Sequence, residues 1–270
     1  MPVAPPFARP FFSIVMPTHL RPLLLQRALQ SLLAQAFQSF EILLVADAWD
    51  PASAEVATRL LRPTDTFVKR SGAPGPALSR NMGLSLARGE WVVFLDDDDS
   101  FAPHHLARLH ERARAGDAEW LYTDCEVVTE DRQQPGMPEL TRQLLPLAAA
   151  DPAQLWVKNF IPNHALAYRR SLLEGCLFDP HMASLEDWEF LLAVYGRAAP
   201  RYWSGGGVVM HKDYVNPGQR RGQQENASNS VVIQDFLYTY RRWPAPTPEL
   251  KAQRQALLAT VGLSLPPEWF

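Results

Sequence analysis

Cysteine is scarce in this 270-residue sequence: only Cys125 and Cys176 are present, too few for a disulfide framework. Their spacing does not suggest a zinc site. A surplus of basic residues is absent too. The formal net charge of -3 lacks the electrostatic footprint of a nucleic-acid binder. A phosphate-bearing ligand would therefore need a local positive group, either a bound cation or a few well-placed arginines.

Long apolar runs and a targeting segment are also missing. No stretch is long enough to span a bilayer, and residues 1–12 are proline-rich without the basic-then-apolar layout of a signal peptide. We therefore expect a cytoplasmic protein that has no transmembrane segment and touches a membrane at most peripherally. Its 47% hydrophobic residues are enough to build a full core.

From Phe11 onward, short β-rich runs alternate with segments of helical periodicity. This pattern is typical of βαβ units and predicts an α/β fold around a mainly parallel sheet. Gly89 is expected to close the third helix, and the tail after residue 231 to form two helices separated by a linker at 244–248. We expect strands at 11–16, 41–45, 66–69, 91–95, 120–128, 165–168 and 205–211, and helices at 22–33, 54–61, 77–88, 152–157 and 185–195.

Four consecutive aspartates, residues 96–99, follow the all-apolar strand at 91–95. Ligands of open α/β sheets bind at the carboxyl ends of strands, so these carboxylates lie where a site is built. One interpretation is an acidic loop in which Asp99 or Ser100 helps to start the next helix, near Pro103. The other is a site for Mn²⁺ or Mg²⁺, which the position after a buried strand favours. In an extended backbone, Asp96 and Asp98 would point to the same side.

Glu186 and Asp187 begin a strongly amphipathic helix and also have two interpretations. Ser184 and Asp187 fit a capping box, which satisfies free amides at a helix start. Alternatively, an acid in the first turn of a rigid helix is well placed to act as a catalytic base.

Isolated polar residues leave similar alternatives open. Arg80 is either a solvated helix residue or a phosphate ligand, and His211 is either a hydrogen-bonded imidazole or a ligand of metal or phosphate. Thr18, after Pro17, is either a turn residue or a ligand contact. Arg220 and Arg221 are either a solvated pair or a phosphate clamp.

Taken together and in their order along the chain, these segments resemble the family 2 glycosyltransferases of the GT-A fold, from about residue 11 to about residue 228. The sequence SIVMPTHLR at 13–21 is similar to the family's opening strand and turn, and EILLVAD at 41–47 follows as expected. The most specific match is SRNMGLSLARGEWVVFLDDDD at 79–99. The second is Phe178-Asp-Pro together with LEDWEF at 185–190.

The resemblance implies a role for each matching residue. Asp187 would be the general base of an inverting transfer, Asp98 would hold Mn²⁺ or Mg²⁺ against the donor diphosphate, and His211 would assist the ion. The nucleotide of the donor, with UDP preferred, would be bound by Pro17, Thr18, Asp47, Arg80, Asp96 and Asp97. The acceptor would be a hydroxyl of an unidentified saccharide, lipid-linked or other molecule.

The resemblance also suggests boundaries. We expect a tail at 1–10, a glycosyltransferase domain at 11–230 with a nucleotide-binding half at about 11–100 and an acceptor-binding half at about 101–230, and a helical extension at 231–270. The extension would cover the acceptor groove or form a homodimer contact. The sequence departs from the family at His19-Leu20, in place of Tyr-Asn, and at Ala46 and Ala48-Trp49, in place of Asp and Gly-Ser, so the base-binding pocket is altered.

Two rival functions differ from this prediction. A sugar nucleotidyltransferase would follow its first strand with a glycine-rich phosphate loop, whereas residues 17–35 contain no glycine. A non-catalytic nucleotide-sugar-binding protein would keep the fold but bind the donor without transfer. Retention of Asp98, Asp187 and His211 together favours an enzyme.

Overall fold

The computed structural model describes residues 9–215 and 229–270. Arg220, Arg221 and most of the expected tail at 1–10 lie outside the described residues. The main sheet has seven strands, in the order β10 (Arg201–Tyr202), β6 (Trp120–Tyr122), β9 (Leu166–Arg169), β4 (Trp91–Phe94), β1 (Phe12–Thr18), β2 (Phe40–Ala46) and β3 (Thr66–Lys69). β1 pairs in parallel with β2 and β4, whereas β9 is antiparallel to both of its neighbours. The predicted mixed, mainly parallel α/β sheet is confirmed.

A second sheet begins near the carboxyl ends of β4 and β6, because two of its strands follow these strands after short turns. It contains β5 (Ser100–Phe101), β11 (Val208–Asp213), β7 (Cys125–Glu130) and β8 (Glu139–Leu145), in that order. The single strand expected at 120–128 was wrong: the chain leaves the main sheet after Tyr122 and enters the second sheet at Cys125. The loop with Pro135 and Pro138 is the turn of the β7/β8 hairpin.

Local sequence explains where the helices begin. α2 starts behind Asp50, whose side chain accepts hydrogen bonds from the backbone N–H groups of Ala52 and Ser53, and Thr247 caps α7 in the same way. Proline fills the first position of four helices, where its missing N–H costs nothing. The helices are α1 (Pro22–Leu33), α2 (Pro51–Leu60), α3 (Pro76–Leu86), α4 (His105–Arg114), α5 (Glu186–Tyr195), α6 (Asn229–Arg242) and α7 (Pro248–Ala259), with 3-10 turns at Pro152–Trp156, Asn163–Ala165, Arg170–Leu173 and Pro267–Trp269. The helix expected at 152–157 is thus a 3-10 turn.

The apolar stripe of α1 shows how the helices are held. Leu25, Leu29 and Leu32 are fully buried, and each contributes about 2 kcal/mol from the apolar area removed from water. The stripe turns inward on the sheet, which fixes the β1–α1 loop at the sheet's carboxyl edge.

Gly89 does not close α3 as the sequence predicted. The helix ends at Leu86, and Ala87 is already extended. Gly89 is needed instead where the chain crosses β1: a Cβ there would lie 2.5 Å from Ser13 N and 2.7 Å from the carbonyl carbon of Phe12. A close backbone approach, and not a helix cap, requires glycine here.

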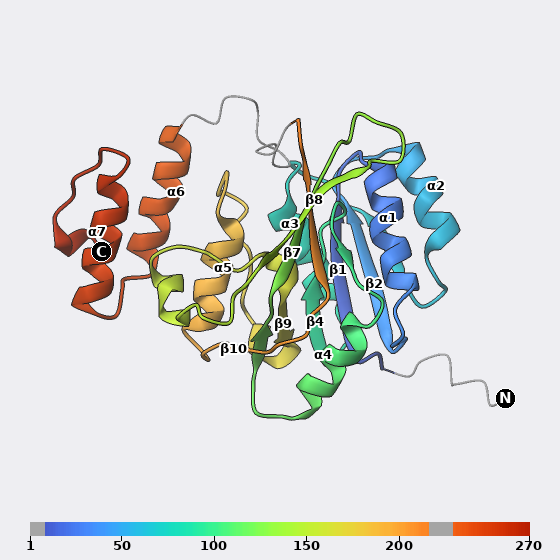
Figure 1. The fold of residues 1–270 in the computed structure, drawn as a ribbon, viewed down its shortest axis with the longest axis horizontal. Helices are drawn as coiled ribbons and strands as arrows, with labels where there is room; N and C mark the ends of the chain where they lie inside the picture. The colour runs from blue at the N-terminus through green and yellow to red at the C-terminus, as the bar shows by residue number, and fades with distance from the viewer. Residues whose placement is uncertain (1–8, 216–228) are drawn as a thin grey trace.

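The two helices predicted in the tail are α6 and α7, which form one end of the molecule beyond α5, far from α1 and α2 (Figure 1). They pack on the same apolar core as the sheet, since Tyr240, Leu258 and Phe270 belong to the core cluster. None of the helices in the described part of the chain is long and apolar enough to cross a membrane.

Candidate active site

The aspartate run lies at the carboxyl end of β4, in the middle of the main sheet. The backbone turns there, with the N–H of Asp99 donating to the carbonyl of Asp96 at 3.1 Å. The extended backbone assumed for Asp96 and Asp98 is therefore replaced by a turn. Both side chains are nevertheless partly exposed, while Asp97 and Asp99 are buried. Asp96 and Asp98 are the two members of the run that can reach a ligand.

Asp97 organises the end of β1. Its Oδ2 accepts hydrogen bonds from Thr18 Oγ1 at 2.7 Å and from the backbone N–H of His19 at 3.3 Å. Its Oδ1 lies 3.3 Å from Nη2 of Arg21. Thr18 and Asp97, both predicted to contact the donor, are thus brought together across neighbouring strands, with Pro17 buried one residue earlier on β1.

Asp98 is neutralised by two arginines. Its Oδ2 accepts from Nη1 of Arg21 at 2.8 Å and lies 3.5 Å from Nη1 of Arg132. The carboxylates of Asp96, Asp97 and Asp98 together raise the pKa of Arg21 against the opposing effect of burial. The repulsion among these neighbouring carboxylates is thus relieved by the protein's own guanidinium groups.

Asp99 pairs with a buried imidazole. Its Oδ2 lies 2.9 Å from Nδ1 of His164, and its Oδ1 accepts from the backbone N–H of His211 at 2.9 Å. Burial opposes charge on His164, but Asp99 outweighs it and holds the pKa of His164 well above its ordinary value. Neither Asp99 nor Ser100 caps α4, as one interpretation had it, because α4 begins only at His105 behind an uncapped His104.

His211 is fixed through both ring nitrogens. Nε2 is 2.8 Å from Ser100 Oγ, and Nδ1 is 3.1 Å from Oε2 of Glu130. Burial alone would raise the pKa of Glu130, but hydrogen bonds from His211 and Arg27 lower it to about 2. His211 is therefore a well-ordered imidazole at the edge of the acidic run.

Arg80 joins the aspartate run to the start of α5. It is buried on α3, and its guanidinium donates to Asp96 Oδ1 and to Glu186 Oε1, each at 2.9 Å. Burial opposes its charge, but Asp96, Glu186 and Asp187 raise its pKa. Arg80 is thus neither solvated nor pointing freely toward a phosphate. It holds the first turn of α5 beside Asp96.

Asp187 is partly buried in that first turn, with Oδ1 accepting from the N–H of Trp188 at 2.8 Å. The predicted capping box is wrong. Ser184 donates its N–H and its hydroxyl to Asp235 Oδ2, at 2.7 and 2.8 Å, and Leu185 precedes the helix with a left-handed φ of 62°. The turn that carries Asp187 is therefore fixed from α6.

Asp47 is buried at the end of β2, with both oxygens engaged. Oδ1 lies 2.6 Å from His19 Nδ1, and Oδ2 accepts from the N–H of Gly75 at 2.8 Å. Arg70 supports the same loop through the carbonyls of Ser71, Ala73 and Gly75.

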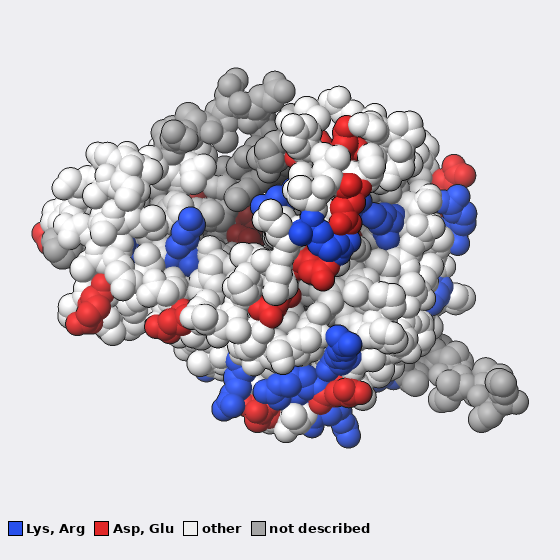
Figure 2. Space-filling model, viewed as in Figure 1, with Lys and Arg blue, Asp and Glu red and all other residues white. Residues whose placement is uncertain are grey.

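Several residues of this network carried no readable signal in the sequence. Arg21, Arg27, Arg132, Glu130 and His164 come from segments far apart in the chain, and each is an ordinary polar residue locally. Arg21 alone had a hint, as the last residue of the opening motif. At the surface, Arg142 of β8 pairs with Glu126 and Glu139. Acidic and basic side chains also lie next to one another on the face shown in Figure 2.

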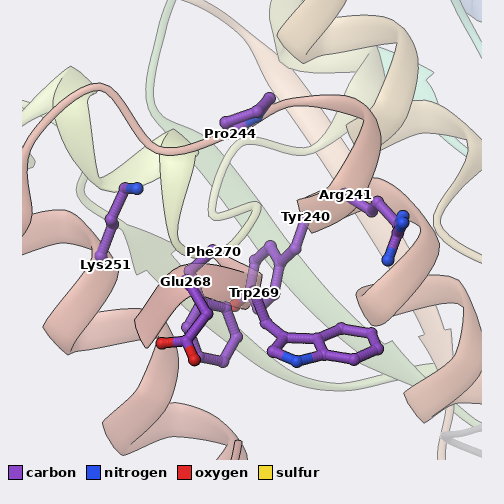
Figure 3. Close-up of a pocket in the computed structure, with 7 residues that line it drawn as sticks. All are labelled: Tyr240, Arg241, Pro244, Lys251, Glu268, Trp269 and Phe270. Atoms are coloured by element: carbon purple, nitrogen blue, oxygen red, sulfur yellow. The ribbon is translucent and has the colours of Figure 1, made fainter. Parts of the chain in front are cut away.

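A separate pocket of about 310 Å³ lies in the C-terminal extension (Figure 3). It contains none of the predicted site residues and does not border the aspartate run. Its lining is Tyr240, Arg241, Pro244, Lys251, Glu268, Trp269 and Phe270.

Residues 13–177, more than half of the chain, match the model of Glycosyl transferase family 2. The chain belongs to the family 2 glycosyltransferases. Among similar proteins is WcaA of Escherichia coli (strain K12), assigned to colanic acid biosynthesis as a glycosyl transferase. It is 28% identical over 239 residues, which cover 86% of this chain and 81% of WcaA. A GalNAc(5)-diNAcBac-PP-undecaprenol beta-1,3-glucosyltransferase of Campylobacter jejuni is 32% identical over 124 residues, covering 45% of this chain and 40% of that protein.

Solved structures show that this glycosyltransferase has the GT-A fold. S. aureus TarS 1-349 in complex with UDP-GlcNAc superposes with a TM-score of 0.66 at 18% identity, over 94% of this chain and 73% of that one. The mannosyltransferase PcManGT from Pyrobaculum calidifontis, in complex with GDP-Man and Mn²⁺, gives 0.57 at 19% identity, over 98% and 80%. The GT-A prediction is confirmed.

The side chains that could act as metal ligands in this glycosyltransferase fit a divalent ion at one position. Asp98 offers a partly exposed carboxylate, and hard cations are often held by one or two carboxylates plus substrate phosphates. Among the described residues, no group of three or more His, Cys, Asp or Glu side chains is arranged to hold an ion without a substrate. His211 could join only by releasing its bond to Ser100 or Glu130.

Proposed function

We propose that this protein transfers a sugar from a UDP-sugar to an acceptor hydroxyl with inversion, in the synthesis of a polysaccharide or glycoconjugate, and that Asp187 is its general base. The observation that carries the proposal is the Arg80 bridge. One buried guanidinium binds Asp96, at the donor end of β4, and Glu186, the neighbour of Asp187. The proposed base is therefore held beside the proposed donor site.

The known proteins support the choice of substrates. TarS was solved with UDP-GlcNAc, WcaA is assigned to colanic acid, and the Campylobacter enzyme is named for an undecaprenol-linked acceptor. PcManGT, solved with GDP-Man, shows that the same fold also accepts another nucleotide. UDP is proposed here because the TarS structure superposes better.

Asp187 would remove the proton of the acceptor hydroxyl as that oxygen attacks the sugar carbon. A carboxylate in the first turn of α5 is rigidly placed, which favours a single displacement from the face opposite the leaving nucleotide. One displacement inverts the anomeric centre. Arg80 would hold the Asp187 carboxylate at a fixed position relative to the donor, without contacting the acceptor itself.

The donor would lie along the carboxyl edge of β1, β2 and β4, over the turn that Pro17, Thr18 and Asp97 build and against Asp96, which Arg80 holds, with the Asp47 loop beside its nucleoside. Asp98, joined by His211 if its ring is released, would hold Mn²⁺ or Mg²⁺. When bound, such an ion neutralises charge on the departing diphosphate. We also propose that residues 11–100 form the nucleotide-binding half and 101–230 the acceptor-binding half, with 231–270 as an extension.

The test is Asp187→Asn. The substitution keeps shape but removes the base, so we expect turnover to fall by about 10²- to 10⁴-fold, with UDP-sugar affinity largely unchanged. Turnover and binding are measured separately, by product release and by calorimetry. The matched control is Asp117→Asn. Asp117 lies just after α4 and pairs with Arg112 and Arg201.

NMR of the product tests inversion directly, because the coupling at the anomeric carbon reports its configuration. Undiminished transfer by Asp187→Asn would show that Asp187 is not the general base. Donor binding without any transfer by the unmodified protein, across acceptors, would favour a non-catalytic binder.

A further inference from the structure

Another pocket, of about 350 Å³, lies at the amino edge of the main sheet and is lined by Arg9, Pro10, Ala87, Arg88 and Arg170. These residues come just before β1, just before β4 and just after β9, which is antiparallel to β4. All of them therefore lie at the edge opposite the aspartate run. β1 is seven residues long, which separates the two edges by about 20 Å. A ligand in this pocket would be distinct from the sugar donor.

The chain at 88–89 is held from inside the sheet. The backbone N–H of Gly89 donates to Ser13 Oγ, and that of Arg88 donates to Glu41 Oε1, each at 2.8 Å. Ser13 and Glu41 are buried neighbours on β1 and β2, and the serine hydroxyl donates to the same Oε1 at 2.6 Å. The carbonyl groups of Arg88 and Gly89 consequently have fixed positions at the pocket.

These two carbonyl groups orient two arginine side chains. Nε of Arg9 donates to the carbonyl of Arg88 at 2.8 Å, and Nε of Arg170 donates to the carbonyl of Gly89 at 3.0 Å. Among the residues that the structure describes, none accepts a hydrogen bond from an Nη atom of Arg9 or Arg170, and no carboxylate forms an ion pair with either. The outer ends of both guanidinium groups are thus held in place and remain able to donate to a ligand.

The pocket carries an excess of positive charge. Arg88 donates to Glu41 through Nε and Nη2, at 2.8 and 2.6 Å, but Glu41 does not line the pocket. Glu90, which follows Gly89, pairs with Arg169 and does not line it either. Like charges repel, so guanidinium groups around one cavity favour an anion that they can share. Their planar forks match the geometry of phosphate oxygens.

We propose that Arg9, Arg88 and Arg170 form a second phosphate-binding site, which is separate from the donor site and does not depend on the proposed reaction. Its ligand is a phosphate or diphosphate group, either free or in the headgroup of an anionic lipid. A volume of about 350 Å³ is near the lower end of the range for small-molecule sites, which suits such a group. Arg9 and Arg170 donate through their Nη atoms, and Arg88 contributes Nη1, since its Nε and Nη2 bind Glu41.

Calorimetry with inorganic pyrophosphate tests the site, with UDP in excess to fill the donor site. The unmodified protein should bind pyrophosphate, and Arg9→Gln and Arg170→Gln should each weaken that binding by about tenfold, the effect of losing a hydrogen bond to a charged group. The matched control is Arg59→Gln. Arg59 is an exposed arginine of α2 that donates to Gln26, so this variant changes the net charge equally but should keep the affinity. Thermal melts without ligand confirm that each variant is folded.

Vesicle sedimentation distinguishes the two sources of phosphate. The proteins are mixed with vesicles of phosphatidylcholine, with and without phosphatidylglycerol. Sedimentation that requires phosphatidylglycerol and is lost in Arg9→Gln and Arg170→Gln would assign the site to a lipid headgroup. Pyrophosphate binding without sedimentation would assign it to a free phosphate.

Three results would overturn the proposal: no binding of either kind, binding that Arg9→Gln and Arg170→Gln retain in full, or an equal loss in Arg59→Gln. None of them bears on the transfer reaction, which is measured by product release.

Discussion

Single residues in this site act mainly by pairing charges. Arg80 forms an ion pair with Asp96, and Arg21 forms ion pairs with Asp97 and Asp98. Because Arg80 has two acidic partners, its loss would leave two carboxylates facing each other without their shared cation. A buried pair that loses one partner is strongly destabilised.

We therefore predict that Arg80→Met lowers the free energy of unfolding by about 3 kcal/mol. Urea unfolding curves measure the change. The control is Arg142→Met, since Arg142 is an exposed arginine with two acidic partners, and exposed pairs contribute less than about 1 kcal/mol. Equal losses in the two variants would contradict a special role for the buried bridge.

The sequence predicted the site's acids better than their partners. The aspartate run and Asp187 could be located because each stands at the end of an apolar element. The partners lie far away in the chain: Thr18 meets Asp97 and Asp99 meets His211 only after folding. No local pattern encodes such pairs, which is why the arginines that neutralise the run and the commitment of Asp47 to His19 could not be predicted.

At the scale of elements, the strands and helices before Phe94 lie within three residues of their predicted bounds. The differences are largest at helix ends: α2 begins already at Pro51 and α3 ends at Leu86. The second sheet was missed. β8 is almost entirely exposed, so it lacks the apolar signal of a buried strand, and β7 follows β6 after two residues. Pairing with β11, over 80 residues later, defines β7, and a single-sequence pattern does not contain that contact.

The junction of α4 and β11 gives a pH-dependent stability. His105, the first residue of α4, is buried, and its Nδ1 accepts from the N–H of Gly207 at 3.1 Å. Burial, with a smaller effect of His164, lowers its pKa to about 3. When the pH is below about 6.5, the ordinary pKa of histidine, His105 binds a proton in the unfolded chain but not in the folded protein. Stability therefore falls as the pH falls.

We predict a loss of about 2 kcal/mol from His105 between pH 7.5 and pH 5. The measurement is the unfolding free energy in urea at several pH values, for the unmodified protein and for His105→Gln. The amide oxygen of Gln can still accept from Gly207 but does not titrate. Parallel pH curves for the two proteins would show that His105 is not the source.

At the scale of the whole molecule, the two C-terminal helices share one apolar core with the main sheet. The segment of α6 holds that of α5 through several contacts. Asp235 accepts from Ser184 just before α5, and Arg242 and Trp243, at the end of α6, lie 3.1 and 2.8 Å from Glu189 Oε1. Trp188, next to Asp187 on α5, packs against the rings of Phe236 and Tyr240 on α6. The sequence predicted the two helices but not that they support the proposed base.

This support predicts a kinetic effect at a distance. Asp235→Ala removes the acceptor for Ser184 and frees the left-handed turn at Leu185, so Asp187 should lose its position. Because small displacements of a reacting group can cost about 10²-fold in rate, we expect turnover to fall by at least tenfold. Donor affinity should stay unchanged, since Asp235 binds Ser184 and not the strand ends at which the donor is proposed to lie.

The conservative variant and a neighbour separate positioning from general damage. Asp235→Asn keeps an oxygen that can accept from Ser184, so it should recover much of the turnover, while Gln234→Ala, on the exposed side of α6, should behave as the unmodified protein. Turnover and donor affinity are measured on the same preparations. If Asp235→Ala weakened donor binding as much as it slowed transfer, the extension would be stabilising the whole site and not the placement of Asp187.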